Sequence, residues 1–222
     1  MFLGYIFDVE GTLVDSVSYN LKSFQEALER LGHTVPFDTL QLYSGLDGDQ
    51  TLQLLMPGLE AFSRKKILDL KSNIFRNQYL ECVKPFPAVR EVFQALKERG
   101  GKIALATDCK GPELKRYMSL INVANLVDAI ACGDDVQHGK PDPRLVNLAV
   151  QKLGVRAPAA VMIGDTPYDA EAGREAGTVA AGLLTGGFAA NALEEAGCFA
   201  VAESLPALLP ALEASRGGRH AN

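Results

Sequence analysis

The chain alternates between short apolar runs and segments in which apolar residues recur at helical spacing. Six runs are apolar on both faces, as strands inside a parallel sheet are, and they lie at residues 2–7, 102–106, 129–132, 160–163, 179–184 and 199–202. Helical patterns occupy residues 89–99, 112–120, 143–153, 169–176 and 205–214. Strands that alternate with helices predict an α/β fold in which helices cover both faces of a doubly wound parallel sheet.

Glycines mark the expected ends of three of these helices. Gly100, Gly154 and Gly177 stand where a helix C-terminus favours a residue in the left-handed conformation. Residues 216–220, at the end of the chain, are of low complexity and are predicted to be a frayed end.

One segment breaks the alternation. From about residue 18 to residue 82 the pattern contains helical stretches at 21–31, 49–55 and 63–80 and no strand candidate. This pattern predicts a helical cap domain, residues 18–82, inserted after the first strand of a core domain that comprises residues 1–17 and 83–222.

Composition and charge narrow the class of protein. The 222 residues carry a formal net charge of −5, which argues against broad binding to nucleic acid or to an anionic membrane. No apolar stretch is long enough for a signal peptide or a membrane span. The four cysteines are far apart and are expected to be reduced, so we predict a cytoplasmic location. The sequence leaves the oligomeric state open.

Polar side chains follow several of the predicted strands. They are Asp8 and Glu10 after the first run, Thr107 after the second, Lys140 after the third, and Asp165 and Asp169 after the fourth. In an open parallel sheet, ligands bind beyond the carboxyl ends of the strands, so these groups are expected to converge on one edge.

The chemistry of such a cluster is specific. Asp8 and Asp165 close together would repel one another unless a cation lay between them, and Mg²⁺ prefers such oxygen ligands. Lys140 and the Thr107 hydroxyl would then donate to phosphate oxygens. A carboxylate such as Asp8 is also able to act as a nucleophile and to form an aspartyl-phosphate.

Four short motifs, in order along the chain, resemble those of the haloacid dehalogenase (HAD) superfamily. Residues 8–16 read DVEGTLVDS and are similar to its first motif, usually DxDGTLxDS; Thr107 matches the second, Lys140 in GKPDP the third, and GDTPYD at residues 164–169 the fourth. The branch most similar to this chain is the phosphoglycolate phosphatase and β-phosphoglucomutase-like group, which has a Rossmann-like core and a small helical cap.

The resemblance implies roles for the residues of the core. Asp8 is implied to be the nucleophile and a magnesium ligand, and Asp165 a second ligand. Glu10 would give the metal its backbone carbonyl, and its side chain would be the general acid and base. Thr107 and Lys140 would hold the phosphoryl group.

Further positions are assigned with less detail. Asp169 is expected to be an outer-shell or additional contact of the metal. The cap loop around Gly45 and Asp47 is expected to face the active site and to contact the substrate. Of the carboxylates that follow the second and third runs, Asp108 and Asp134 among them, Asp134 is the better candidate for an outer-shell role.

Glu10 departs from the family pattern, which has Asp at this position. Its longer side chain moves the carboxylate by more than an ångström on a fixed backbone, and misplacement of that order can cost about 10²-fold in rate. The charge argues against a dehalogenase, which carries an aromatic residue here, and against a phosphonatase, which carries a small one and a cap lysine.

We therefore expect a magnesium-dependent phosphatase that acts on a small phosphorylated metabolite, similar to phosphoglycolate phosphatase. Two alternatives stay open. One is a phosphosugar mutase, for which the loop at residues 45–49 lacks the usual arginine. The other is a weakly catalytic relative kept for binding or regulation, because of Glu10.

Overall fold

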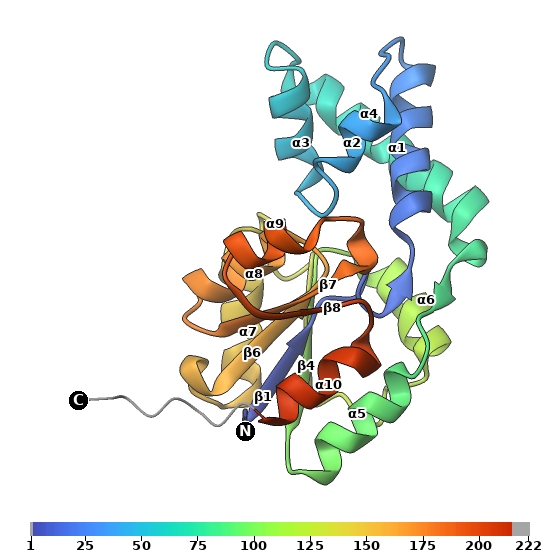
Figure 1. Cartoon of the computed structure of the whole chain (residues 1–222). Helices are drawn as coiled ribbons and strands as arrows, with labels where there is room; N and C mark the ends of the chain where they lie inside the picture. The colour runs from blue at the N-terminus through green and yellow to red at the C-terminus, as the bar shows by residue number, and fades with distance from the viewer. Residues whose placement is uncertain (1, 215–222) are drawn as a thin grey trace.

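The computed structural model describes residues 2–214 and contains a six-stranded parallel sheet (Figure 1). Its strands are β1 (Gly4–Phe7), β4 (Lys102–Thr107), β5 (Ala129–Cys132), β6 (Ala160–Gly164), β7 (Val179–Leu183) and β8 (Cys198–Ala202). The order across the sheet is β5-β4-β1-β6-β7-β8, and every neighbouring pair is parallel. The predicted fold class is confirmed, and each strand ends within two residues of its apolar run.

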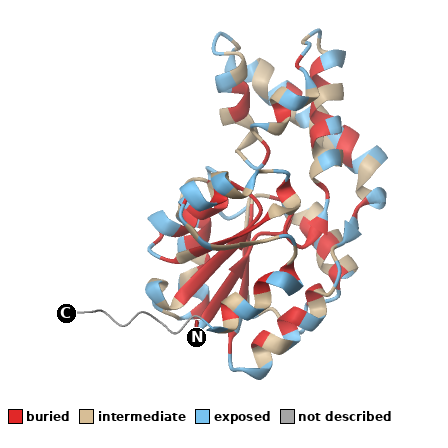
Figure 2. Ribbon diagram, in the orientation of Figure 1, coloured by how far each residue is buried: buried red, intermediate tan, exposed pale blue. Residues whose placement is uncertain are grey.

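Helices cover both faces of the sheet, because residues along each strand point alternately to opposite sides. Tyr5 and Phe7 of β1 pack with α5 (Val89–Glu98), α6 (Gly111–Ile121) and α10 (Leu205–Ala214). Ile6, between them, packs with α7 (Arg144–Leu153) and α8 (Pro167–Glu175). The three central strands, β1, β4 and β6, are accordingly almost entirely buried (Figure 2).

The glycines at the ends of α5, α7 and α8 are in the predicted conformation. Gly100, Gly154 and Gly177 have φ of 80°, 63° and 79°. A short helix that the pattern did not predict, α9 (Ala190–Glu195), lies between β7 and β8 in the chain. Residues 216–220, predicted to be a frayed end, lie outside the residues that the structure describes.

The segment that breaks the alternation is helical. It comprises α1 (Val17–Arg30), α2 (Phe37–Gln41), α3 (Gly48–Leu55) and α4 (Ala61–Ile74), which continues into a π turn, η1 (Phe75–Tyr79), and a 3-10 turn, η2 (Leu80–Cys82). Its buried residues form their own cluster, with Phe24, Leu28, Leu52 and Ile67 at the centre. Figure 1 shows these helices above the carboxyl edge of the sheet. We propose to treat residues 18–82 as a cap domain on this basis.

The cap is attached through a short antiparallel ribbon. β2 (Val14–Asp15) leads into the cap and pairs with β3 (Lys84–Pro85), which leads out of it. The Phe86 amide extends the pairing by donating to the Leu13 carbonyl at 2.9 Å. Neither strand was predicted, because two-residue strands have no periodicity that a sequence pattern can display.

The cap also touches the core on the other side of the site. The Gln41 side chain donates to the Gly186 carbonyl at 3.0 Å, and the Tyr168 hydroxyl donates to the Leu42 carbonyl at 3.4 Å. Gly45 has φ of +83°, and a Cβ there would lie 2.5 Å from Thr166 Cγ2, so only glycine lets the cap loop approach the core so closely. No helix within residues 2–214 is long and apolar enough to cross a membrane.

Candidate active site

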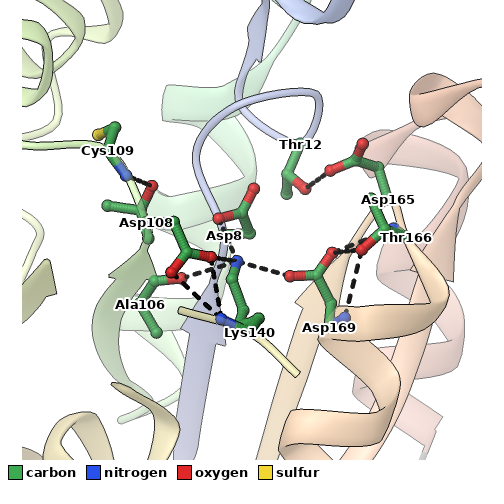
Figure 3. A network of polar contacts seen from close by, with 10 residues as sticks. Asp8, Thr12, Ala106, Asp108, Cys109, Lys140, Asp165, Thr166 and Asp169 are labelled. Carbon is green, nitrogen blue, oxygen red and sulfur yellow. Dashed lines mark hydrogen bonds and ion pairs between the residues drawn. The ribbon is translucent and has the colours of Figure 1, made fainter. Parts of the chain in front are cut away.

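The strand order brings the predicted site residues together. β1 lies between β4 and β6, so Asp8 after β1 is flanked by Thr107 at the end of β4 and Asp165 after β6. Asp8, Thr107 and Asp165 are between 1% and 5% exposed. Figure 3 shows the carboxylates turned toward one another at this edge of the sheet.

Lys140 reaches this cluster from the loop that follows β5. Its ammonium donates to Asp8 Oδ1 at 2.5 Å and to Asp169 Oδ1 at 2.6 Å (Figure 3). A weaker contact joins it to the Ala106 carbonyl at 3.4 Å, and Asp108 Oδ2 lies 3.8 Å away. Lys140 is 3% exposed, so these carboxylates, not water, surround its charge.

Burial and charge together set the proton affinities in the cluster. Burial disfavours the ammonium form of Lys140, but Asp169, Asp8 and Asp108 together raise its pKa well above the usual value. Burial raises the pKa of Asp8 to about 7 and that of Asp108 to about 6, although Lys140 opposes both shifts. The single positive charge of Lys140 therefore offsets the negative charge of these carboxylates only in part.

Asp165 has a free oxygen at the centre of the acidic group. Its Oδ1 accepts a hydrogen bond from the Thr12 hydroxyl at 2.7 Å, while Oδ2 is buried without a hydrogen-bond partner. Burial, followed by the charges of Asp169 and Asp8, raises the pKa of Asp165 well above its usual value. Oxygens of Asp8, Asp165 and Asp169 lie within 4.8 Å of one another. An orphaned carboxylate oxygen in such a group fits a hard divalent cation such as Mg²⁺.

The backbone is closely packed against Asp165. A Cβ at Gly11 or at Gly186 would lie 2.2 Å from Asp165 Oδ2. Gly11 also has φ of +82°, so the turn after β1 requires glycine for its conformation as well. Because Gly11 and Gly186 have no side chains, Asp165 Oδ2 has room beside it.

Both oxygens of Asp169 are already bound. Oδ1 accepts from Lys140, and Oδ2 accepts from the Thr166 amide at 3.0 Å and the Thr166 hydroxyl at 2.7 Å. Thr166 and Asp169 thereby form the capping box that begins α8. The position of Asp169 is fixed by the helix start, and its place at the rim of the acidic group is compatible with the outer-shell contact that we predicted.

Glu10 is held by two side chains that sequence patterns did not single out. Its Oε1 accepts from Asn20 Nδ2 of α1 at 2.8 Å and from the Tyr117 hydroxyl of α6 at 2.9 Å. Tyr117 is fully buried, and burial, followed by the charge of Glu10, raises its pKa. Both partners are far from the motifs in sequence, so only the fold reveals them.

A cavity of about 220 Å³ lies between the cap and the core over these residues. Asp8, Glu10, Thr107 and Lys140 line its core side, and Gly45 and Asp47 belong to its cap side. A neighbouring cavity of about 390 Å³ shares Glu10, Asp47 and Lys71 with it, and these sizes are in the range of small-molecule sites, roughly 300–1,000 Å³, or below it.

Asp47 lines the cavity and also caps a helix. Its Oδ1 accepts from the Asp49 and Gln50 amides at 3.0 and 3.1 Å and so caps the N-terminus of α3. The Thr107 hydroxyl similarly accepts from the Cys109 amide at 3.3 Å. Each of these side chains keeps a fixed position at the wall of the cavity.

The two carboxylates that the sequence left ambiguous separate in the structure. Asp108 lies at the cluster, where its carboxylate accepts from the Lys140 amide at 3.2 Å. Asp134, preferred from the sequence for an outer-shell role, is exposed and accepts from the Gly111 amide at 2.8 Å instead. Asp134 thus lies at the start of α6, apart from the acidic group of Asp8, Asp165 and Asp169.

The fold and the site are those of an enzyme with a capped α/β core, and comparison with known proteins supplies its family. Residues 5–183 match the haloacid dehalogenase-like hydrolase family, and the chain belongs to it. This assignment agrees with the four motifs and with the acidic group at the carboxyl edge of the sheet.

Individual relatives agree with this family. A phosphoglycolate phosphatase of Aquifex aeolicus is 31% identical over 82% of this chain and 84% of its own length. A phosphorylated carbohydrates phosphatase of Thermotoga maritima is 28% identical over 78% of this chain and 80% of its own length. A hydrolase from Pseudomonas syringae has a crystal structure that superposes with a TM-score of 0.89 at 27% identity, covering 96% of this chain and 98% of that one.

Replacement of Lys140 by Met tests the charge balance of the cluster. The change leaves Asp8, Asp108 and Asp169 without their cation, and breaking a buried pair in this way costs about 3–5 kcal/mol of unfolding free energy at pH 8. Lys140 opposes the raised pKa values of Asp8 and Asp108, so its loss raises both further above the ~3.9 of an unfolded aspartate, and the folded variant binds protons that the folded wild type does not. The deficit should therefore shrink from pH 8 to pH 5.5, measured by urea unfolding in EDTA.

The control is Lys65→Met, which removes an exposed ion pair with Asp69 and should cost less than about 1 kcal/mol at either pH. A deficit of Lys140→Met that is equal at both pH values would contradict this account of the cluster.

Proposed function

We propose that the chain is a magnesium-dependent phosphatase that hydrolyses a small phosphomonoester through an aspartyl-phosphate on Asp8. The observation that carries the proposal is the group of buried carboxylates around one ammonium, at the floor of a small cavity closed by the cap. The family and the phosphatase names of the relatives support the same reaction. We also propose a cytoplasmic location, which agrees with four free cysteines.

In the first half of the reaction, a carboxylate oxygen of Asp8 attacks the phosphorus atom. The bond between phosphorus and the leaving-group oxygen breaks as the bond to Asp8 forms, and Glu10 donates a proton to the departing oxygen. Lys140, bound to Asp8 Oδ1, orients the nucleophile. Lys140 and the Thr107 hydroxyl also stabilise the charge on the phosphoryl oxygens.

In the second half, water replaces the alcohol. Glu10, now deprotonated, accepts a proton from the water as its oxygen attacks phosphorus. The bond between phosphorus and Asp8 breaks, so that inorganic phosphate leaves and both carboxyl groups return to their starting state. Asn20 and Tyr117 hold Glu10 Oε1 throughout and compensate for the freedom of the longer side chain.

Residues for a metal ion are present in the same group. Asp8, Asp165 and the backbone carbonyl of Glu10 would hold Mg²⁺, with Asp169 as an outer-shell partner. The bound ion supplies positive charge that offsets the carboxylates and the phosphoryl oxygens. The free Oδ2 of Asp165 supports this assignment.

The cap supplies the rest of the substrate site. Gly45 and Asp47 would contact the leaving group from above, and closure of the cap would exclude bulk water from the aspartyl-phosphate. A weakly catalytic binding or regulatory role is less well supported, because Glu10 is anchored at the cavity that Asp8 also lines.

Substitution of the nucleophile tests the reaction directly. Asp8→Asn should lower turnover of p-nitrophenyl phosphate by at least about 10³-fold, because an amide oxygen is a poor nucleophile. Urea unfolding should show that the variant still folds. Asp69→Asn, at an exposed position on α4, is the matched control and should keep the activity. Substantial turnover by Asp8→Asn would refute the assignment.

Metal exchange tests the acidic group. Treatment with EDTA should remove the activity toward p-nitrophenyl phosphate, and added Mg²⁺ should restore it. Ca²⁺ should fail to do so, because it takes more ligands in a looser arrangement. Equal rates with Ca²⁺, or full activity in EDTA, would count against the magnesium site.

The tether on Glu10 is testable through the leaving group. Tyr117→Phe removes one hydrogen bond and keeps the packing, so it should lower kcat for ethyl phosphate about three- to tenfold. The loss should be smaller for p-nitrophenyl phosphate, whose leaving group needs little protonation. Tyr79→Phe, which removes the hydroxyl of a ring stacked on Tyr19, is the control. Equal losses on both substrates would mean that Tyr117 does not act through Glu10.

A further inference from the structure

One lysine of the cap lines the cavity, and its ammonium makes no hydrogen bond or ion pair with residues 2–214. Lys71 lies on α4, is half-buried, and lines the 220 Å³ cavity together with Asp8. Its ammonium lies 5.4 Å from the centroid of the Phe24 ring, a cation–π contact. An aromatic face, not an anion, is therefore what this ammonium contacts among the described residues.

The carboxylates that act on Lys71 are engaged elsewhere. Glu10, Asp47 and Glu113 are the acids whose charge favours its ammonium form, while burial lowers its pKa. Glu10 Oε1 is held by Asn20 and Tyr117, and Asp47 Oδ1 caps α3. Glu113 lies 3.8 Å from the Arg76 guanidinium. The Lys71 ammonium is therefore bound by none of the three.

The second cation at the cavity is committed to the core. Of the residues that the structure describes, Lys71 and Lys140 are the cations in its wall, and Lys140 is bound to Asp8 and Asp169. Lys140 thus serves the phosphoryl end of a substrate, at the nucleophile. Lys71 lies on the cap, so it faces the other end, which is the leaving group.

We propose that Lys71 binds a second anionic group on the substrate, so that the preferred substrates are phosphomonoesters or anhydrides whose leaving group carries a carboxylate or a phosphate. The proposal rests on the phosphatase function proposed above. A second anion supplies the partner that the ammonium lacks, and a charge-assisted hydrogen bond shielded from water is among the stronger polar contacts in proteins. A leaving group without charge would leave the ammonium unpaired when the cap is closed.

The test compares leaving groups in the wild-type protein with Mg²⁺. The probes are 2-phosphoglycolate, with a carboxylate, pyrophosphate, with a second phosphate, and ethyl phosphate, with neither; p-nitrophenyl phosphate reports the basic reaction. We expect kcat/KM for 2-phosphoglycolate or pyrophosphate to exceed that for ethyl phosphate by at least about tenfold. The two anionic probes distinguish a carboxylate from a phosphate as the preferred partner.

Variants assign the preference to the lysine. Lys71→Met should lower kcat/KM for the preferred anionic probe at least about tenfold more than for ethyl phosphate, mainly through KM, and Lys71→Arg should keep most of the preference. The ratio of variant to wild type decides, because it cancels the intrinsic reactivity of each probe. Lys66→Met, on an exposed position of the same helix, is the control and should change none of the ratios.

Two results would overturn the inference while leaving the phosphatase function intact. One is turnover of p-nitrophenyl phosphate by the wild type with no preference for either anionic probe over ethyl phosphate. The other is an equal loss on every probe in Lys71→Met, which would assign the lysine to Glu10 or to the packing of the cap. Absence of turnover on all probes would reject the proposed function and this inference with it.

Discussion

Mutual repulsion among closely spaced carboxylates, most of them buried, is the constraint on which the rest of this molecule depends. Asp8, Asp108, Asp165 and Asp169 meet at one edge of the sheet, and a single ammonium lies among them. Such a group persists only if the scaffold holds each side chain against the repulsion. Three features hold these side chains in place: the central position of β1, the capping box at the start of α8, and the close packing of two glycines against Asp165.

The same constraint separates two kinds of positive charge at the cavity. Lys140 is surrounded by core carboxylates and stays with Asp8, the proposed nucleophile, whereas Lys71 approaches from the cap and lies against the Phe24 ring. In the proposed reaction, the core thus provides the groups that bind the phosphoryl group, which is the same in every substrate. Recognition of the leaving group would fall to the cap, where Gly45 and Asp47 belong to the loop between α2 and α3.

Much of the core could be predicted from the sequence, because buried strands and the helices between them leave strong apolar patterns. The motif residues were predictable for the same reason, since Asp8, Thr107 and Asp165 directly follow or end such strands. Side chains whose role depends on long-range contacts could not be found in this way. From the sequence, Tyr117 is an ordinary core position of a helix. Only the fold shows that its hydroxyl donates a hydrogen bond to Glu10.

The cap lysines illustrate the same limit. Lys65, Lys66 and Lys71 lie on one helix and are equivalent as sequence, but Lys71 alone among them lines the cavity. Asp134 shows the converse. Its place after a strand predicted a site residue, but its carboxylate accepts a hydrogen bond from the Gly111 amide at the start of α6. In both cases the rotation of a helix, or the direction of one side chain, decides whether the residue lies at the site, and neither can be read from the sequence pattern.

The ribbon of β2 and β3 has a consequence for how substrates reach the nucleophile. Both crossings of the chain between the two domains run side by side and are hydrogen-bonded to each other, so the covalent connections of the cap lie along one margin. Opposite that margin, Gln41 on Gly186 and Tyr168 on Leu42 are single hydrogen bonds, each of modest net strength. A cap that opens on the side away from the ribbon has to break these two hydrogen bonds, and neither of them takes part in the proposed chemistry.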